Sequence, residues 1–135
     1  MKYVNFKIED LESKGEELCK NYINVYPFPH IIIDNFFHDK ILDSIIDDFP
    51  KDIKDFNNID NKNFEKKLTL NQSYKFSDIT NDFINFLNSS LFVKFLQKLT
   101  NIEEALIPDP YLVGGGLHEL RNGGYLNVHS DFNRH

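Results

Sequence analysis

His129 and Asp131 are the two residues of this chain whose types and spacing are best suited to chemistry. Side chains alternate across a β-strand, so residues two apart project from the same face. An imidazole and a carboxylate placed in this way can bind one metal ion together, and they supply two of the three protein ligands of a facial Fe(II) site. We therefore predict His129 and Asp131 as metal ligands.

These ligands fall on the second strand of a predicted β-hairpin. Asn122-Gly123 separates two apolar runs, and Asn-Gly is typical of a two-residue turn in which both central residues take a positive φ. With this loop, we predict four cross-strand pairs: Leu120 with Tyr125, His118 with Asn127, Gly116 with His129, and Gly114 with Asp131.

Directly opposed residues share one face of a sheet, so the register defines what surrounds the metal. Tyr125 and Asn127 are the polar neighbours on the ligand face, and we predict that they bind the cofactor. Glycines often mark a close approach to a strand, so Gly114–Gly116 would leave room for the metal and what it carries. The opposite face would resemble a core, with Leu117, Glu119, Leu126, Val128 and Phe132.

A His-x-Asp pair is a weak signal on its own, and an alternative stays open in which His129 is a hydrogen-bonded sheet residue and Asp131 begins a turn. For His30 and His38 we favour structural roles, while His118 either faces the site or is simply exposed. No Ser/His/Asp triad context, phosphate-binding glycine loop or paired-cysteine spacing is present in the sequence.

Length and composition predict one packed domain. The chain has 135 residues, 41% of them hydrophobic and 14% aromatic, which excludes a disordered chain. The net charge of −6 gives no basic footprint for nucleic acid or for an acidic membrane surface. Cys19 is the only cysteine, which fits a reducing cytoplasm, and no apolar run approaches the roughly 20 residues of a membrane span.

The hydrophobic periodicity predicts an α+β domain in which helices precede the hairpin. We expect helical support over 1–110 and the metal-ligand hairpin over 111–135. Helices are predicted over 10–25 and 39–49. From Asp78 we expect either two helices or one that is broken near Asn88-Ser89-Ser90, with Ser89 or Ser90 capping the second. Strands are predicted over 30–37 and 66–70, with polar surface chain over 51–63. Asp43, Asp47 and Asp48 are interpreted as a solvated acidic face rather than a calcium site.

Several of these stretches together resemble a known family. PFPHIIIDNFF, the acidic helix ending at Phe49-Pro50, and the closing LIPDPYLVGGGLHELRNGGYLNVHSDFNRH are similar to the N-terminal half of a 2-oxoglutarate- and Fe(II)-dependent oxygenase of the prolyl 4-hydroxylase-like branch. The resemblance covers about residues 27–135, and its most specific part is Gly-Gly-x-x-x-x-His-x-Asp. It implies a double-stranded β-helix, or jelly roll, with helices packed outside it.

The resemblance also implies a function. His129 and Asp131 would bind Fe(II), with 2-oxoglutarate and O₂ as cosubstrates, and the enzyme would hydroxylate an unactivated C–H bond in a prolyl residue of a peptide or protein, or in a small molecule. The family's tyrosine before the Gly-Gly aligns with Leu120. A second histidine and an Arg or Lys follow later in the family, so we expect the chain to be an N-terminal portion, with the first strands of an incomplete jelly roll, and to be inactive alone. A non-catalytic interaction domain and a cupin-like metalloprotein are the alternatives.

Overall fold

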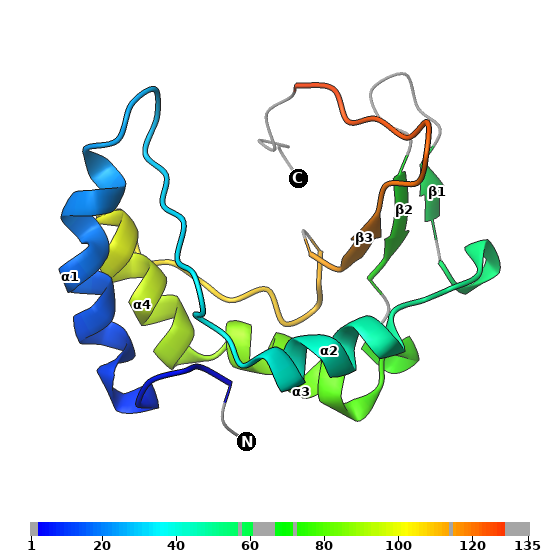
Figure 1. Ribbon diagram of the computed structural model, residues 1–135, viewed down its shortest axis with the longest axis horizontal. Helices are drawn as coiled ribbons and strands as arrows, with labels where there is room; N and C mark the ends of the chain where they lie inside the picture. Colours follow the sequence, from blue (N-terminus) through cyan, green and yellow to red (C-terminus); the bar gives the residue numbers. More distant parts are fainter. Residues whose placement is uncertain (1–2, 57, 61–66, 72, 114, 129–135) are drawn as a thin grey trace. The chain divides into compact units, whose positions relative to one another are not determined.

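The computed structural model describes residues 3–56, 58–60, 67–71, 73–113 and 115–128 (Figure 1). The chain divides into two compact units. The first comprises Met1–Asp48 and Tyr74–Tyr111, and the second comprises Phe49–Ser73 and Leu112–His135.

The first unit contains the α-helices, at the positions where hydrophobic periodicity predicts them. They are α1 (Leu11–Ile23), α2 (Asp39–Asp48), α3 (Asp78–Leu87) and α4 (Ser90–Thr100), and a 3-10 turn, Ile8–Asp10, precedes α1. Helices α1 and α4 lie side by side (Figure 1). Their backbones come close at Gly15, where an added Cβ would lie 2.6 Å from the carbonyl oxygen of Phe95.

Serine side chains begin the last two helices. Ser77 caps α3 by accepting a hydrogen bond from the backbone N–H of Thr80, and Ser89 caps α4 by accepting one from Phe92. Helix α4 ends at Asn101, which takes a left-handed φ of 54°. The predicted break between the helices and the Ser89 cap are therefore confirmed, and each cap satisfies an N–H group that the helix cannot pair internally.

The core of the first unit is rich in aromatic residues. Its buried members come from the N-terminal segment, the chain before α2, and helices α1, α3 and α4: Val4, Leu11, Phe36, Phe86, Phe95 and Leu99. The rings of Tyr3 and Phe86 stack with centroids 4.5 Å apart, and those of Phe36 and Phe95 lie 5.2 Å apart. Burial of such large apolar surfaces is the main stabilising contribution to this unit.

The strand predicted over 30–37 is wrong. Residues 31–33 are extended but belong to no strand, a turn follows at Asp34-Asn35, and Phe37 forms only an isolated bridge with Val4. The N–H groups of Asn5 and His38 donate to the carbonyls of Phe36 and Tyr3, each at 3.0 Å. The β-branched composition is strand-like, but no described strand lies alongside, and the apolar side chains pack against the helices instead.

The second unit contains an open, antiparallel, three-stranded sheet in the order β1-β2-β3. Its strands are β1 (Asn58–Asp60), β2 (Lys67–Leu70) and β3 (Leu117–Glu119). Short 3-10 turns occur at Ile53–Asp55 and Ser73–Lys75. The strand predicted over 66–70 is confirmed, whereas β1 falls in a stretch predicted as surface chain. Along the chain, β1 and β2 fall between α2 and α3, but the helices and the antiparallel sheet form different compact units, so the fold class is α+β.

The register of β2 and β3 distinguishes the two faces of this sheet. Leu68 pairs with Glu119, Thr69 with His118, and Leu70 with Leu117. Leu68 and Leu70 are buried, so Leu117 and Glu119 share the buried face. Thr69 and His118 lie on the opposite face, where His118 is exposed.

None of the described helices has the length and apolar character that a membrane-spanning helix requires.

Candidate metal centre

The predicted ligands His129 and Asp131 lie outside the residues that the structure describes, as do Gly114, Phe132 and His135. The predicted pairs of Gly116 with His129 and of Gly114 with Asp131 therefore also lie outside the described residues. The structure does describe the elements that lead to the ligands: strand β3, the turn after it, and the chain up to Val128.

The chain reverses at the predicted position. The N–H of Gly124 donates to the carbonyl of Arg121 at 2.7 Å, which closes a turn with Asn122 and Gly123 at its centre. Gly123 has a φ of 79°, but Asn122 does not take a positive φ. The turn is therefore of type II, and the prediction of positive φ at both central residues is wrong. The loop still has two residues, so Arg121 lies opposite Gly124, as the predicted register requires.

The second strand of the predicted hairpin is not formed in its described part, so that prediction is wrong there. Between Gly124 and Val128 only Leu126 forms a bridge, and no strand is present. Strand β3 makes its described ladder with β2, in which His118 pairs with Thr69. An isolated two-stranded hairpin is marginal in water, which explains why β3 forms with β2 as its partner.

Tyr125 and Asn127, the predicted cofactor-binding residues, are both exposed. Tyr125 is 45% exposed. Leu126 and Val128, predicted to be core-like, are exposed as well. That prediction is wrong for these two residues because no described element covers them.

Of the three glycines that precede β3, Gly116 lies against the end of β2. Gly116 has a φ of 148°, and an added Cβ would lie 2.6 Å from the carbonyl oxygen of Leu70 and 3.1 Å from the Cβ of Asn71. A close approach at this glycine was predicted, but the group that comes close is the end of β2. Gly116 therefore does not provide space for a metal.

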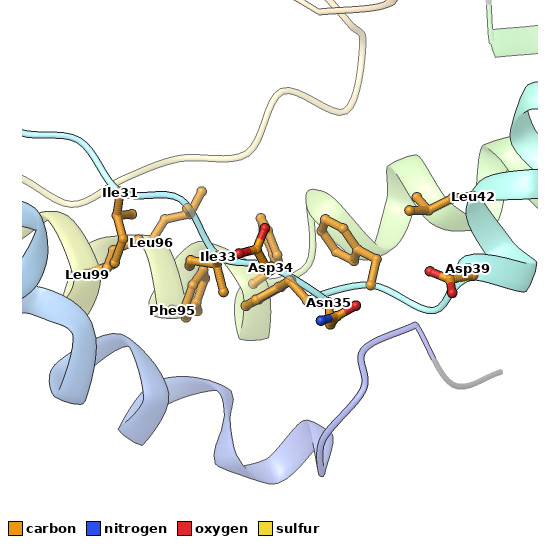
Figure 2. A pocket seen from close by; sticks show the side chains of 12 residues that line it. Ile31, Ile33, Asp34, Asn35, Asp39, Leu42, Phe95, Leu96 and Leu99 are labelled. Carbon is orange, nitrogen blue, oxygen red and sulfur yellow. The ribbon is translucent and has the colours of Figure 1, made fainter.

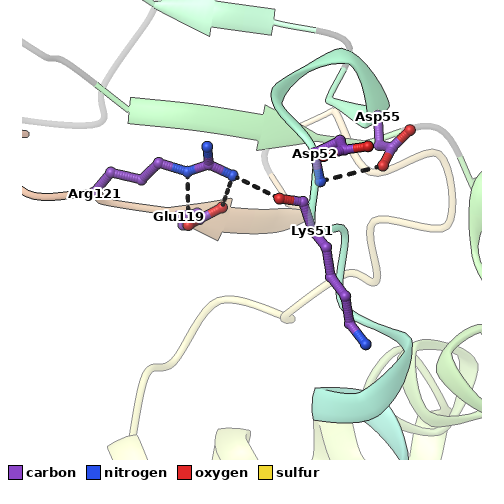
Figure 3. Close-up of polar contacts among 5 residues, drawn as sticks. All are labelled: Lys51, Asp52, Asp55, Glu119 and Arg121. Carbon is purple, nitrogen blue, oxygen red and sulfur yellow. Dashed lines mark hydrogen bonds and ion pairs between the residues drawn. The ribbon is translucent and has the colours of Figure 1, made fainter.

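An ion pair fixes the end of β3 just before the turn. Arg121 binds both carboxylate oxygens of Glu119, at 2.9 and 3.2 Å, and its guanidinium also donates to the carbonyl of Lys51 at 3.1 Å (Figure 3). Nearby, the N–H of Asp52 donates to Asp55 (Figure 3). The Glu119 carboxylate is thus already engaged by a cation.

The remaining metal-binding side chains do not gather. No group of three His, Cys, Asp or Glu residues suited to a metal ion occurs within the described ranges. His30 is exposed, with Nδ1 2.9 Å from the carbonyl oxygen of Phe28, which agrees with a structural role. His38 has a buried Nε2 that lacks a hydrogen-bond partner in the described part of the chain.

The acidic face of α2 is solvated, as interpreted from the sequence, but Asp48 has a further role that sequence reasoning missed. Its carboxylate accepts hydrogen bonds from the N–H of Ser77, at 3.2 Å, and from the hydroxyl of Thr80, at 2.8 Å. Hydrogen bonding from Ser77, and then from Thr80, lowers the pKa of the Asp48 carboxyl, while burial raises it. Asp48 thereby joins the end of α2 to the beginning of α3. The N-terminus of α3 carries a partial positive charge, which favours a negative carboxylate there.

The described part of the site is therefore a turn, an edge strand and two exposed polar side chains that precede the predicted ligands. A scan against protein-family models gives no match for this chain, and searches of curated proteins and of solved structures give none either.

Proposed function

We propose that this chain is the N-terminal part of a 2-oxoglutarate- and Fe(II)-dependent dioxygenase in which His129 and Asp131 bind the metal. The observation that carries the proposal is the tight turn at Asn122-Gly123, which precedes His-x-Asp at the spacing of the family motif and follows an edge strand. A His and a carboxylate are the donor set that suits Fe(II) in a facial site. The third ligand would be a histidine from a later strand.

In this proposal, β1, β2 and β3 are the first strands of a jelly roll. A jelly roll needs further strands to close, and they would cover the exposed apolar residues near the turn, among them Leu120 and Leu126. The face of β3 that carries His118 is exposed, so it is not filled by core side chains. This open face is compatible with a metal and a cosubstrate.

The chain's own residues would then bind and orient. His129 and Asp131 would hold the metal, and Tyr125 and Asn127 would donate hydrogen bonds to a carboxylate of 2-oxoglutarate. When bound, Fe(II) supplies the oxidising chemistry with 2-oxoglutarate and O₂, and the protein contributes geometry and water exclusion. A later Arg or Lys would neutralise the far carboxylate of the cosubstrate.

The substrate belongs to this proposal as well. We expect hydroxylation of an unactivated C–H bond, in a prolyl residue of a peptide or protein or in a small molecule. A cytoplasmic location fits the lone Cys19, and the acidic balance makes nucleic acid and acidic membranes unsuitable partners.

The test uses the protein extended to include the later strands, with His129→Ala and Asp131→Ala variants. Each is expected to lose succinate formation from 2-oxoglutarate and to weaken metal binding, which is measured anaerobically with Co(II) as a spectroscopic probe. His30→Ala is the matched control, because His30 is an exposed histidine in the first unit. The 135-residue chain alone should not turn over.

The outcomes separate the alternatives. If His129→Ala retains metal binding and 2-oxoglutarate turnover, the oxygenase proposal is wrong. Metal binding that depends on His129 without 2-oxoglutarate consumption would indicate a cupin-like protein of other chemistry. Absence of both in the unaltered, extended protein would favour a non-catalytic interaction domain.

A further inference from the structure

A pocket of about 470 Å³ lies within the first unit, between the chain that precedes α2 and helix α4. Figure 2 shows Ile31, Leu96 and Leu99 toward one end, Asp39 and Leu42 toward the other, and Asp34 between them. The volume is within the range of ligand sites, which are mostly apolar with a few polar groups. This pocket is far in sequence from the predicted metal ligands.

One wall of the pocket is an extended segment with unused hydrogen-bonding groups. Ile31 and Ile33 line the pocket, whereas Ile32 points away and is 83% exposed, which is the alternation of a strand. Within the described residues, the backbone N–H and C=O groups of Ile31, Ile32 and Ile33 make no hydrogen bond. The segment therefore has the geometry of an edge strand without its partner.

The pocket also carries two carboxylates without a counterion. Asp34 and Asp39 both line it, and neither side chain makes an ion pair or hydrogen bond in the described part of the chain. Asp34 lies in the middle of a largely apolar surface, and Asp39 lies toward the end where Leu42 is (Figure 2). Such a surface is complementary to a ligand with a cation between two apolar groups.

We propose that this pocket binds an extended peptide segment that pairs with Ile31–Ile33 as an added strand and presents apolar, basic and apolar side chains at alternate positions. Strand addition uses main-chain hydrogen bonds for affinity and pockets for alternate side chains for specificity. The basic side chain meets Asp34, and the carboxylate of Asp39 adds negative charge toward the Leu42 end. The flanking apolar side chains contact the ends of the pocket, near Leu96 and Leu42.

Two other occupants fit these observations less well. A small organic cation would use the carboxylates but would leave the backbone groups of Ile31–Ile33 unpaired. A second copy of this chain carries a net charge of −6, so an acidic surface would approach another acidic protein. The basic, extended peptide is the occupant that uses the apolar walls, the charge and the free backbone together.

The experiment uses the full chain in EDTA, so that its outcome is independent of the proposed iron site. The probe is a fluorescein-labelled peptide of sequence Thr-Leu-Thr-Lys-Thr-Leu-Thr, and binding is followed by fluorescence polarisation. The double variant Asp34→Asn with Asp39→Asn should bind about three- to tenfold more weakly, as expected when one partly exposed ion pair and a second nearby carboxylate are removed. The matched control is Asp43→Asn with Asp47→Asn, two exposed carboxylates that do not line the pocket, and it should change affinity by less than about twofold.

Altered peptides test the cation and the strand separately. Replacing the lysine with glutamine should weaken binding about as much as the aspartate variants do, and N-methylation of alternate peptide amides on the pairing edge should weaken it about tenfold or more. The amide signals of Ile31, Ile32 and Ile33 should shift in NMR spectra on titration. Circular dichroism establishes that each variant remains folded.

Four results would overturn the proposal: unchanged affinity in the Asp34/Asp39 variant, equal binding of the N-methylated peptide, displacement of the peptide by hexylammonium at the peptide's own concentration, and no binding of the probe peptide at all. Peptide release that accompanies concentration-dependent self-association would assign the surface to a second copy instead. Each result leaves the iron-site proposal untouched, because no metal is present.

Discussion

Gly15 lies where α1 and α4 approach each other, and replacing it with alanine tests how tightly the first unit is packed. A Cβ at this position would lie 2.6 Å from the carbonyl oxygen of Phe95, 3.0 Å from the Cβ of Lys98 and 3.3 Å from the N of Leu99. The first distance is well below the roughly 3.3 Å at which a carbon and a carbonyl oxygen meet. Because the oxygen belongs to the backbone of a helix, the two helices must separate.

Two opposing contributions decide whether Gly15→Ala raises or lowers the free energy of unfolding. Alanine is favoured over glycine inside a helix by about 1 kcal/mol, which would stabilise α1. Overpacking of a closely packed interface costs about 1–3 kcal/mol, and here it also disturbs contacts around Phe95 and Leu99, both buried. We expect a net loss of up to about 2 kcal/mol in the free energy of unfolding, and a larger loss for Gly15→Val.

Urea denaturation followed by circular dichroism measures this loss. Asn21→Ala is the control, because Asn21 is exposed on the same helix and its replacement changes helix propensity alone. If Gly15→Ala raised the stability by as much as Asn21→Ala does, the close approach of α1 and α4 would be refuted.

Three further predictions concern the contacts that join or begin the elements, and all are read from urea denaturation. Asp48→Asn should lower stability by about 1 kcal/mol or less, because the carboxylate is partly exposed. Since the pKa of Asp48 is lowered in the folded state, its contribution to stability is present above the ordinary carboxyl pKa of 3.8 and is lost as the pH falls through the folded-state value. This pH dependence should be absent from the stability profile of the variant. Ser89→Ala should cost about 1 kcal/mol by removing the cap of α4, and Ser90→Ala, which keeps that cap, should cost less. Gly116→Ala should lower the free energy of unfolding more than Gly123→Ala, because a Cβ at Gly116 collides with the carbonyl of Leu70. A Cβ at Gly123 has nothing within 4 Å, so that variant loses only the roughly 1 kcal/mol of a left-handed φ. Equal losses would contradict the described end of β2.

The helices could be predicted because their signals are local. Apolar residues at helical spacing, Asp39 in the first turn of α2 and Ser89 before α4 each act within a few residues of where they stand. The strands depend on partners far along the sequence. Residues 30–37 have a strand's composition, but no strand within the described ranges lies beside them. Strand β1, with the sequence Asn-Ile-Asp, has almost no strand signal and forms because it pairs with β2.

The same distinction between local signals and distant partners applies to the candidate site. The position of the reversal at Asn122-Gly123 follows from the residues themselves, and so does its two-residue loop. The pairing of β3 with β2 joins residues about fifty positions apart, and no short motif encodes it. The role of Asp48 and the pocket around Asp34 depend in the same way on which distant helix packs nearby.

The faces of β3 allow one last step for the proposed metal site. The bond that closes the turn sets Arg121 opposite Gly124, so a strand continuing from it would place Asn127 opposite His118 and His129 opposite Gly116. His118 is on the exposed face, whereas a slip by one residue would place the ligands on the face of Leu68 and Leu70, where an unpaired carboxylate is costly to bury. Only the first parity leaves His129 and Asp131 able to reach a metal and a cosubstrate. We therefore expect cross-strand NOEs between Asn127 and His118 in the extended protein, and NOEs that instead join Asn127 to Leu117 or Glu119 would remove the basis for a metal site on this strand.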